Sequence, residues 1–148
     1  MLKKIQPFNP LSNYNLAIKK LKSHNIRPTK QRMVLSKILF EKGNKHITAE
    51  ELYEEVRKQE RKISLATIYN TLKQFCKLGL LKEVIIDQNK SIYCSNNKQH
   101  YHLYIEDENK IIDIPHNKIN IDFNVPEIPA CLNLHNVDII IKIKTKNN

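Results

Sequence analysis

The feature that most constrains the fold is a change in the spacing of apolar residues near residue 80. Before it, four segments repeat apolar residues at three- and four-residue intervals, the period of a helix that is buried along one face. After it, apolar residues gather in short β-rich runs bounded by turn residues. The sequence therefore predicts an α+β protein with a helical amino-terminal part and a strand-rich carboxyl-terminal part.

Three of the helical segments begin at a residue suited to capping a helix amino terminus. Thr29 and Ser64 precede the second and fourth segments, and Thr48 with Glu51 forms a T-x-x-E capping box before the third. Gly79 closes the fourth segment because glycine readily takes the left-handed conformation that ends a helix. These boundaries predict short, separate helices rather than one long one.

Two short β-rich runs follow the fourth helix. "LLKEVIID" and "SIYC" are separated by the turn-like "QNK", a pattern typical of a β-hairpin. Helices followed by such a hairpin form the outline of a winged helix-turn-helix. In that arrangement the fourth helix enters the major groove of DNA, and the hairpin lies against the phosphate backbone.

Positive charge is concentrated in the helical part of the chain. Residues 1–82 hold 18 of the 25 lysines and arginines and 6 of the 15 acidic residues, a net charge of +12. Residues 83–148 have a net charge of −2. A general abundance of lysine would not leave the second part negative, so the asymmetry favours a nucleic-acid-binding module joined to a sensing or pairing module.

The carboxyl-terminal part is expected to be a smaller domain of its own. A polar hinge at residues 95–97 divides the winged-helix domain, residues 1–94, from residues 98–148. The latter contain the strand-like runs "HYHLYIE", "KIIDI" and "VDIIIKIKTK", with prolines that forbid a long helix between the last two. Because so short a segment builds a thin core with exposed strand edges, we expect a strand-rich domain that gains stability by pairing with a second copy.

Composition excludes several classes of protein. No apolar run approaches the roughly 20 residues that span a bilayer, so no membrane association is expected. The start, "MLKKIQPFNPLSN", lacks the apolar core of a secretory signal. Three cysteines without a CxxC pair argue against a disulfide scaffold and for a reducing compartment. We therefore expect a cytoplasmic protein.

Candidate DNA contacts lie on the fourth helix and at the start of the second. Asparagine pairs with adenine edges, threonine meets a thymine methyl group, and lysine reaches guanine or phosphate. Basic residues at a helix amino terminus suit a phosphate, although an ordinary amphipathic helix also turns polar residues to water. The candidates are Arg27, Lys30, Arg32, Ser64, Thr67, Tyr69, Asn70 and Lys73.

The stretch "KQHYHLY" holds the candidate ligands of the second part. Alternate side chains of a strand point the same way, so His100 and His102 share one face, roughly 6.6 Å apart along the chain. Two imidazoles on one face are also common on a solvated strand, and spacing alone favours that plainer interpretation. A closed tetrahedral site needs two more ligands, for which spacing offers His46 and Cys94 only as candidates.

Three longer segments resemble the ferric uptake regulator (Fur) family. These are "IRPTKQRMVLSKILFEKGNKHITAEELYEE", "SLATIYNTLKQFCKLGLL" and "HYHLYIEDENKIIDIP". More narrowly, they are similar to the iron response regulator (Irr) branch, which also lacks the CxxC that most of the family carries after the HxH strand. The resemblance implies a homodimeric, metal-responsive transcription factor with a winged-helix domain and a small strand-rich α/β dimerisation domain. Such a protein would be a repressor of iron or haem homeostasis genes that binds an A·T-rich palindromic operator.

The resemblance also implies a metal site at the hinge. The family uses a histidine near "HITAE", an acidic residue at the end of the wing and the HxH pair, positions held here by His46, Cys94, His100 and His102. The ion would be zinc, ferrous iron or manganese. A thiolate in place of the carboxylate favours zinc or ferrous iron over harder cations. Alternatively, Cys94 is a small buried residue and water is the fourth ligand.

Two other functions stay open at this point. Irr proteins are linked to haem through three consecutive histidines, of which Tyr101 replaces the middle one, so His100, Tyr101 and His102 form an alternative haem site. A small metal-dependent hydrolase could use His46, His100 and His102 to activate water. The hydrolase leaves the basic helical part without a purpose, and no acidic residue nearby is marked as a general base, so we predict a regulator and not an enzyme.

Overall fold

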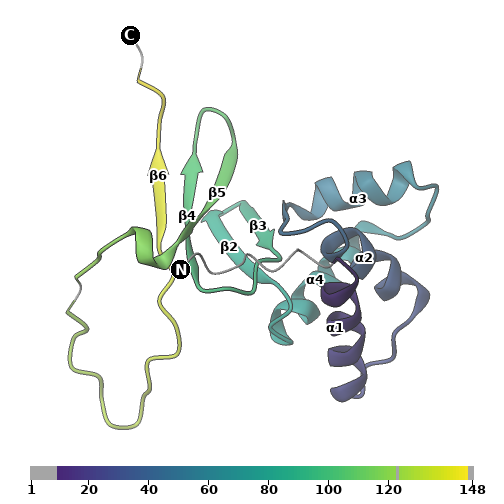
Figure 1. Cartoon of the computed structure of the whole chain (residues 1–148), viewed down its shortest axis with the longest axis horizontal. Coiled ribbons are helices and arrows are strands. Elements are labelled where there is room, and N and C mark those ends of the chain that lie inside the picture. The colour runs from purple at the N-terminus through teal and green to yellow at the C-terminus, as the bar shows by residue number, and fades with distance from the viewer. Residues whose placement is uncertain (1–9, 123, 147–148) are drawn as a thin grey trace, which may run out of the picture. The chain divides into compact units, whose positions relative to one another are not determined.

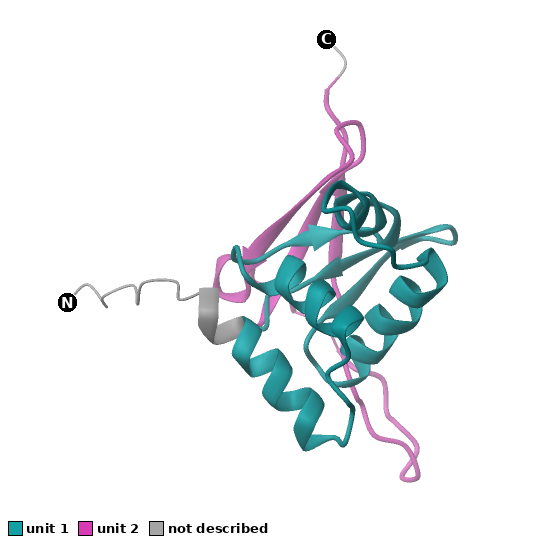
Figure 2. Ribbon diagram, turned by 90° about the vertical axis from the view of Figure 1, so that its right-hand side faces the viewer, with its two compact units in different colours: residues 1–97 teal, residues 98–148 magenta. Residues whose placement is uncertain are grey.

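The computed structural model describes residues 10–122 and 124–146 (Figure 1). The chain forms two compact units, which Figure 2 colours separately: unit 1 is residues 1–97 and unit 2 is residues 98–148. None of the described helices is both long and apolar enough to cross a bilayer.

The described residues of unit 1 form four helices and a small antiparallel sheet. The sheet has the strand order β1-β3-β2, in which β2 and β3 form the hairpin expected after the helices. The elements are α1 (Pro10–Ser23), α2 (Lys30–Phe40), β1 (His46–Ile47), α3 (Ala49–Lys58), α4 (Leu65–Lys77), β2 (Lys82–Asp87) and β3 (Lys90–Cys94). The two-residue strand β1 was not predicted, because it is too short to show a periodicity.

The predicted helix starts are confirmed. The side chains of Thr29 and Ser64 accept hydrogen bonds from backbone N–H groups at the starts of α2 and α4. Thr48 and Glu51 form the complete, reciprocal capping box of α3. Gly79 follows α4 with a φ of +68°, a conformation that glycine adopts without strain.

One continuous apolar core holds unit 1 together. Its buried side chains come from all four helices, from β1 and β3, and from the segment after α4. Phe75 of α4 is fully buried, and its ring centroid lies 6.1 Å from that of Phe40. This core fixes α4 from one side, which leaves its other side exposed.

In unit 2 the part of the chain that the structure describes contains a three-stranded sheet with the order β5-β4-β6. Strand β4 (His100–Ile105) pairs antiparallel with β5 (Lys110–Pro115) and parallel with β6 (Ile140–Ile143). A short 3-10 turn, η1 (His116–Lys118), follows β5. Among the described residues between η1 and β6 there is no further helix or strand, as expected from the prolines there.

Candidate functional site

The two candidate ligands of unit 1 face each other across its sheet. His46 of β1 and Cys94 of β3 are direct partners in the antiparallel ladder. Partners in this position have Cβ atoms about 4.5–5.5 Å apart, and their side chains project from the same face. Cys94 is completely buried, and its Sγ accepts a hydrogen bond from the backbone N–H of Asn96 (3.4 Å). The short strand β1 thus brings together an imidazole and a thiol that are far apart in sequence.

The first residue of the predicted hinge is fixed to unit 1. The backbone N–H of Ser95 donates to the carbonyl oxygen of Lys45 (3.0 Å), and the Ser95 hydroxyl accepts from the Lys45 N–H (2.8 Å). These bonds continue the pairing of β1 with β3, so Cys94 is held from both sides. The hinge at residues 95–97 stays a prediction, and its first residue is bonded to β1.

The candidate ligands of unit 2 converge on a third side chain. Nε2 of His100 lies 2.9 Å from Nε2 of His102. Both nitrogen atoms also approach Oδ1 of Asp113, at 3.2 Å and 3.3 Å respectively. The two histidines are buried, with 6% and 2% of their surface exposed. The predicted shared face of the HxH pair is therefore present, and the pair does not point into water.

A hydrogen bond at Nδ1 of His100 leaves its other ring nitrogen, Nε2, able to bind a cation. Nδ1 of His100 lies 2.6 Å from the carbonyl oxygen of Lys98, which can only accept, so Nδ1 carries the proton. In the neutral ring, Nε2 then presents a lone pair. That lone pair faces a carboxylate oxygen of Asp113, and two acceptors at such a distance need a proton or a metal ion between them.

The distances also fit a metal ion. Ligand atoms about 2.0–2.1 Å from a tetrahedral ion lie about 3.3 Å from one another. The three separations among His100, His102 and Asp113 are 2.9, 3.2 and 3.3 Å. Imidazole and carboxylate together suit zinc, ferrous iron and manganese. A bound ion would accept a lone pair from each of these three atoms.

Asp113 is a candidate ligand that the sequence analysis missed. It stands on β5, directly opposite His102 of β4. A signal was available, because a hairpin closed between Ile105 and Lys110 places residue 102 opposite residue 113. No short motif contains both residues, so only the strand register reveals the pair.

The third residue of the possible haem site lies on the other face. Burial alternates along β4, with His100, His102 and Tyr104 buried and Tyr101 half-buried between them. Tyr101 therefore points away from the cluster, as strand geometry requires. The structure brings the two histidines together with Asp113 rather than with Tyr101.

The exposed side of α4 carries three of the predicted DNA contacts. Tyr69, Asn70 and Lys73 are exposed, whereas Ile68, Leu72 and Phe75 are buried in the core. Ala66 and Lys77 extend the exposed side to both ends of the helix. This single stripe offers an aromatic ring, an amide and two ammonium groups to a partner.

Three other predicted contacts take part in bonds within unit 1. The hydroxyl of Ser64 caps α4 by accepting from the N–H of Thr67 (3.2 Å), and the two hydroxyls bond each other (2.9 Å). The guanidinium of Arg32 donates to the side chain of Gln74 on α4 (2.9 Å) and to the carbonyl oxygen of Arg27 (2.9 Å). These side chains set the position of α4, which the sequence could not show.

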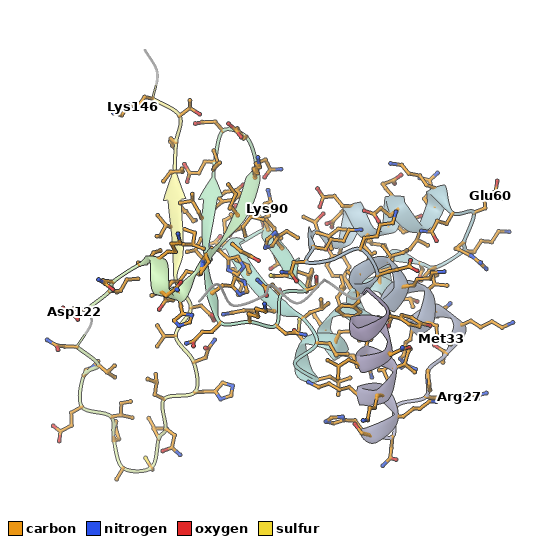
Figure 3. All side chains as sticks on the ribbon, in the orientation of Figure 1. Arg27, Met33, Glu60, Lys90, Asp122 and Lys146 are labelled. Carbon is orange, nitrogen blue, oxygen red and sulfur yellow. The ribbon has the colours of Figure 1, made fainter. Side chains whose placement is uncertain are left out.

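Arg27 and Lys30 remain exposed at the start of α2, where Figure 3 labels Arg27. Exposed cations beside the backbone N–H groups of a first helical turn are a combination that suits phosphate.

Tyr69 makes one further contact that the sequence did not predict. Its hydroxyl donates a short hydrogen bond to the carboxylate of Glu50, in the first turn of α3. This bond, followed by partial burial and the negative charge, raises the pKa of Tyr69 above the ordinary value. The phenol is therefore neutral at physiological pH, and its proton faces Glu50.

Comparison with known proteins identifies the family. Residues 23–142 match the model of the ferric uptake regulator family. The chain belongs to this family. The peroxide-responsive repressor PerR of Staphylococcus aureus (strain Mu50) is 34% identical over 104 residues, which cover 70% of each protein.

Solved structures show the same fold. The Vibrio cholerae ferric uptake regulator superimposes with a TM-score of 0.66 at 24% identity, covering 86% of this chain and 98% of that chain. A zinc-bound manganese uptake regulator superimposes with a TM-score of 0.59 at 26% identity, covering 90% and 98%. The predicted α+β fold, with a helical DNA-binding domain and a strand-rich domain, is confirmed.

Members of the Fur family are dimeric DNA-binding regulators of transcription and not enzymes. The hydrolase alternative therefore finds no support, and this Fur-family chain is a regulator. The comparisons show the family and not the Irr branch within it.

Proposed function

We propose that this protein is a metal-responsive repressor that binds an A·T-rich palindromic operator as a homodimer. The observation that carries the proposal is the convergence of two buried histidines, His100 and His102, on the half-buried Asp113 in a chain of the Fur family. Two imidazoles and a carboxylate in this arrangement suit a cation, and a cation would be the signal to which such a regulator responds.

The proposed ion takes its four ligands from among five side chains of both units: His46 and Cys94 of unit 1, and His100, His102 and Asp113 of unit 2. Cys94 ends β3 and His100 begins β4, so the chain between them allows at most about 21 Å of separation. An ion bound by side chains of both units would favour the orientation of the two units that completes its coordination. Operator affinity would then depend on the ion without contact between ion and DNA.

Zinc and ferrous iron suit the proposed ligand set best, because a thiolate joins the imidazoles. Manganese is the harder alternative. Haem is the less supported effector, because Tyr101 lies on the opposite face of β4 from the two histidines. The similarity to the Irr branch supports iron homeostasis genes as the targets.

The exposed stripe of α4 is the proposed DNA-recognition surface. Asn70 and Tyr69 would contact base edges in the major groove, and Lys73 would contact phosphate. Arg27 and Lys30 would bind a neighbouring phosphate at the start of α2. A dimer repeats these contacts about a two-fold axis, which is why a palindrome is expected.

The test begins with a duplex that the wild-type protein selects from a randomised pool. Affinity for this duplex and for a random duplex is measured with manganese or zinc present and after chelation. We expect metal to change operator affinity by about 5–150-fold, the usual size of a coupling between two sites. Equal affinities for both duplexes, whether or not metal is present, would contradict the proposal.

Substitutions on α4 separate base contacts from phosphate contacts. Asn70→Ala should reduce the preference for the selected duplex by about tenfold. Lys73→Ala should weaken binding to both duplexes alike and lower the salt slope by about one unit per site. Lys110→Ala, an exposed lysine on unit 2, is the matched control and should change neither quantity.

A further inference from the structure

The contact between Tyr69 and Glu50 joins the exposed stripe of α4 to the first turn of α3. Both side chains are exposed, yet the phenol donates a short hydrogen bond to the carboxylate. An exposed tyrosine without such a partner would sample several rotamers. Here the ring is held in one orientation, beside Asn70 on the side of α4 that the core leaves open.

We propose that Glu50 is a positioning residue for base recognition by Tyr69 and that it transmits the state of the metal site to α4. The proposal rests on the function proposed above. With its proton committed to Glu50, the Tyr69 hydroxyl has only lone pairs left to offer. The fixed ring would then meet DNA mainly as an apolar surface, which suits a thymine methyl group.

The same residue is close in sequence to a proposed metal ligand. His46 lies in β1, and α3 begins three residues later at Ala49. The reciprocal bonds of Thr48 and Glu51 fasten the start of α3, so a shift of β1 carries Glu50 with it. A displacement at His46 would therefore reach Tyr69 through a single rigid helical turn.

The second proposed ligand of unit 1 is joined to the same short strand. Cys94 of β3 pairs with His46 of β1, and the preceding Tyr93 pairs with Ile47. A displacement of either ligand would therefore reach the start of α3 through β1.

The test measures the ratio of affinities for the selected and random duplexes in wild type, Glu50→Ala, Tyr69→Phe and the double variant. We expect each single substitution to lower the ratio by about tenfold, the effect of one base contact. The double variant should lose no more than either single variant, because both substitutions remove the same contact. Ratios that multiply in the double variant, or a Glu50→Ala ratio equal to wild type, would overturn the proposal.

Two further variants separate positioning from charge. Glu50→Gln keeps an acceptor for the phenol and should retain most of the ratio, whereas a loss as large as that of Glu50→Ala would contradict positioning. Glu54→Ala removes an exposed carboxylate one turn along α3, where it pairs with Arg57, and should leave the ratio unchanged.

The effect of metal on the duplex ratio distinguishes a residue that transmits the signal from a residue that only stabilises the fold. In Glu50→Ala the affinity for manganese should equal that of wild type, while the change in the duplex ratio on adding manganese should shrink by about fivefold. An unaltered metal response would show that Glu50 does not transmit the signal. If wild type itself shows no duplex preference, the proposed function fails and this inference with it. A wild-type preference with unaffected variants overturns the inference alone.

Discussion

The two units of this chain are stabilised by different kinds of buried side chain. The continuous apolar core runs from Ala17 to Tyr93 and lies wholly in unit 1. Among the described residues of unit 2, the buried side chains are His100, His102 and Tyr104. The buried side chains are thus mainly apolar in unit 1, whereas in the described part of unit 2 they are imidazole and phenol rings.

The two units also differ in the amount of apolar surface that they expose. Most of the large apolar side chains left exposed belong to unit 2: Ile112, Ile121, Val125, Ile128, Leu132, Leu134, Val137 and Ile143. A unit that leaves this much apolar surface in water gains little stability from the burial of its own side chains. From this comparison we expect unit 1 to be a self-sufficient domain, whereas unit 2 would be stabilised by the proposed cation and by a second copy of the chain.

The largest expected effect comes from separating the units. Residues 1–97 alone should unfold cooperatively in urea with a free energy of about 5–10 kcal/mol, because the whole apolar core is retained. Residues 98–148 alone, freed of metal, should show no cooperative transition. Far-UV circular dichroism during urea titration measures both fragments.

Addition of zinc sharpens this first prediction. Zinc should restore structure to residues 98–148, since His100, His102 and Asp113 are all present, and should leave residues 1–97 unchanged. A stable, metal-free fragment of residues 98–148 would break the comparison between the units.

A single core substitution should produce the next largest effect. Phe75→Ala removes a fully buried ring from α4 and should destabilise unit 1 by about 3–5 kcal/mol. The signal at 222 nm follows unit 1 selectively, because the described α-helices all lie there. Ile141→Ala, a half-buried position on β6, is the control in unit 2 and should shift that signal by less than about 0.5 kcal/mol.

Alkaline pH should have a smaller effect, again confined to unit 1. Burial, with the charge of Glu83, raises the pKa of Cys76 from 9.0 to about 11, and burial raises the pKa of Tyr93 from 10.0 to about 12. The folded chain thus holds these protons more tightly than the unfolded chain. Stability is unaffected below pH 9 and falls as pH rises from 9 towards 12.

The expected loss between pH 8.5 and pH 11 is about 2 kcal/mol, measured by urea unfolding at 222 nm. Cys76→Ala should flatten the lower part of this decline, and Tyr93→Phe the upper part. A decline of the same steepness in both variants would assign the alkaline sensitivity to other groups.

The sequence predicted those parts of the fold that are encoded locally. Thr29, Thr48 and Ser64 cap helices through bonds to residues three positions away, so a short window of sequence contains each signal. The shared face of His100 and His102 follows from the two-residue period of a strand. In each case the sequence spacing alone determines the geometry.

The parts that the sequence did not predict depend on distant pairings. Asp113 reaches the histidines through the register of β4 and β5, and His46 reaches Cys94 through a two-residue strand. The bond from Tyr69 to Glu50 joins separate helices, 19 positions apart in the chain. Such contacts form only when tertiary packing brings the elements together, so no local sequence pattern predicts them.

The proposal that one ion takes ligands from both units is tested most directly at His46. Metal affinity of the full chain, measured by competition with a chelator, should fall by at least about tenfold in His46→Ala. His135→Ala, an exposed histidine of unit 2, is the matched control and should bind metal like wild type. If His46→Ala also binds metal as tightly as wild type, the ion is held by unit 2 alone, and the proposed link between metal and operator affinity is wrong.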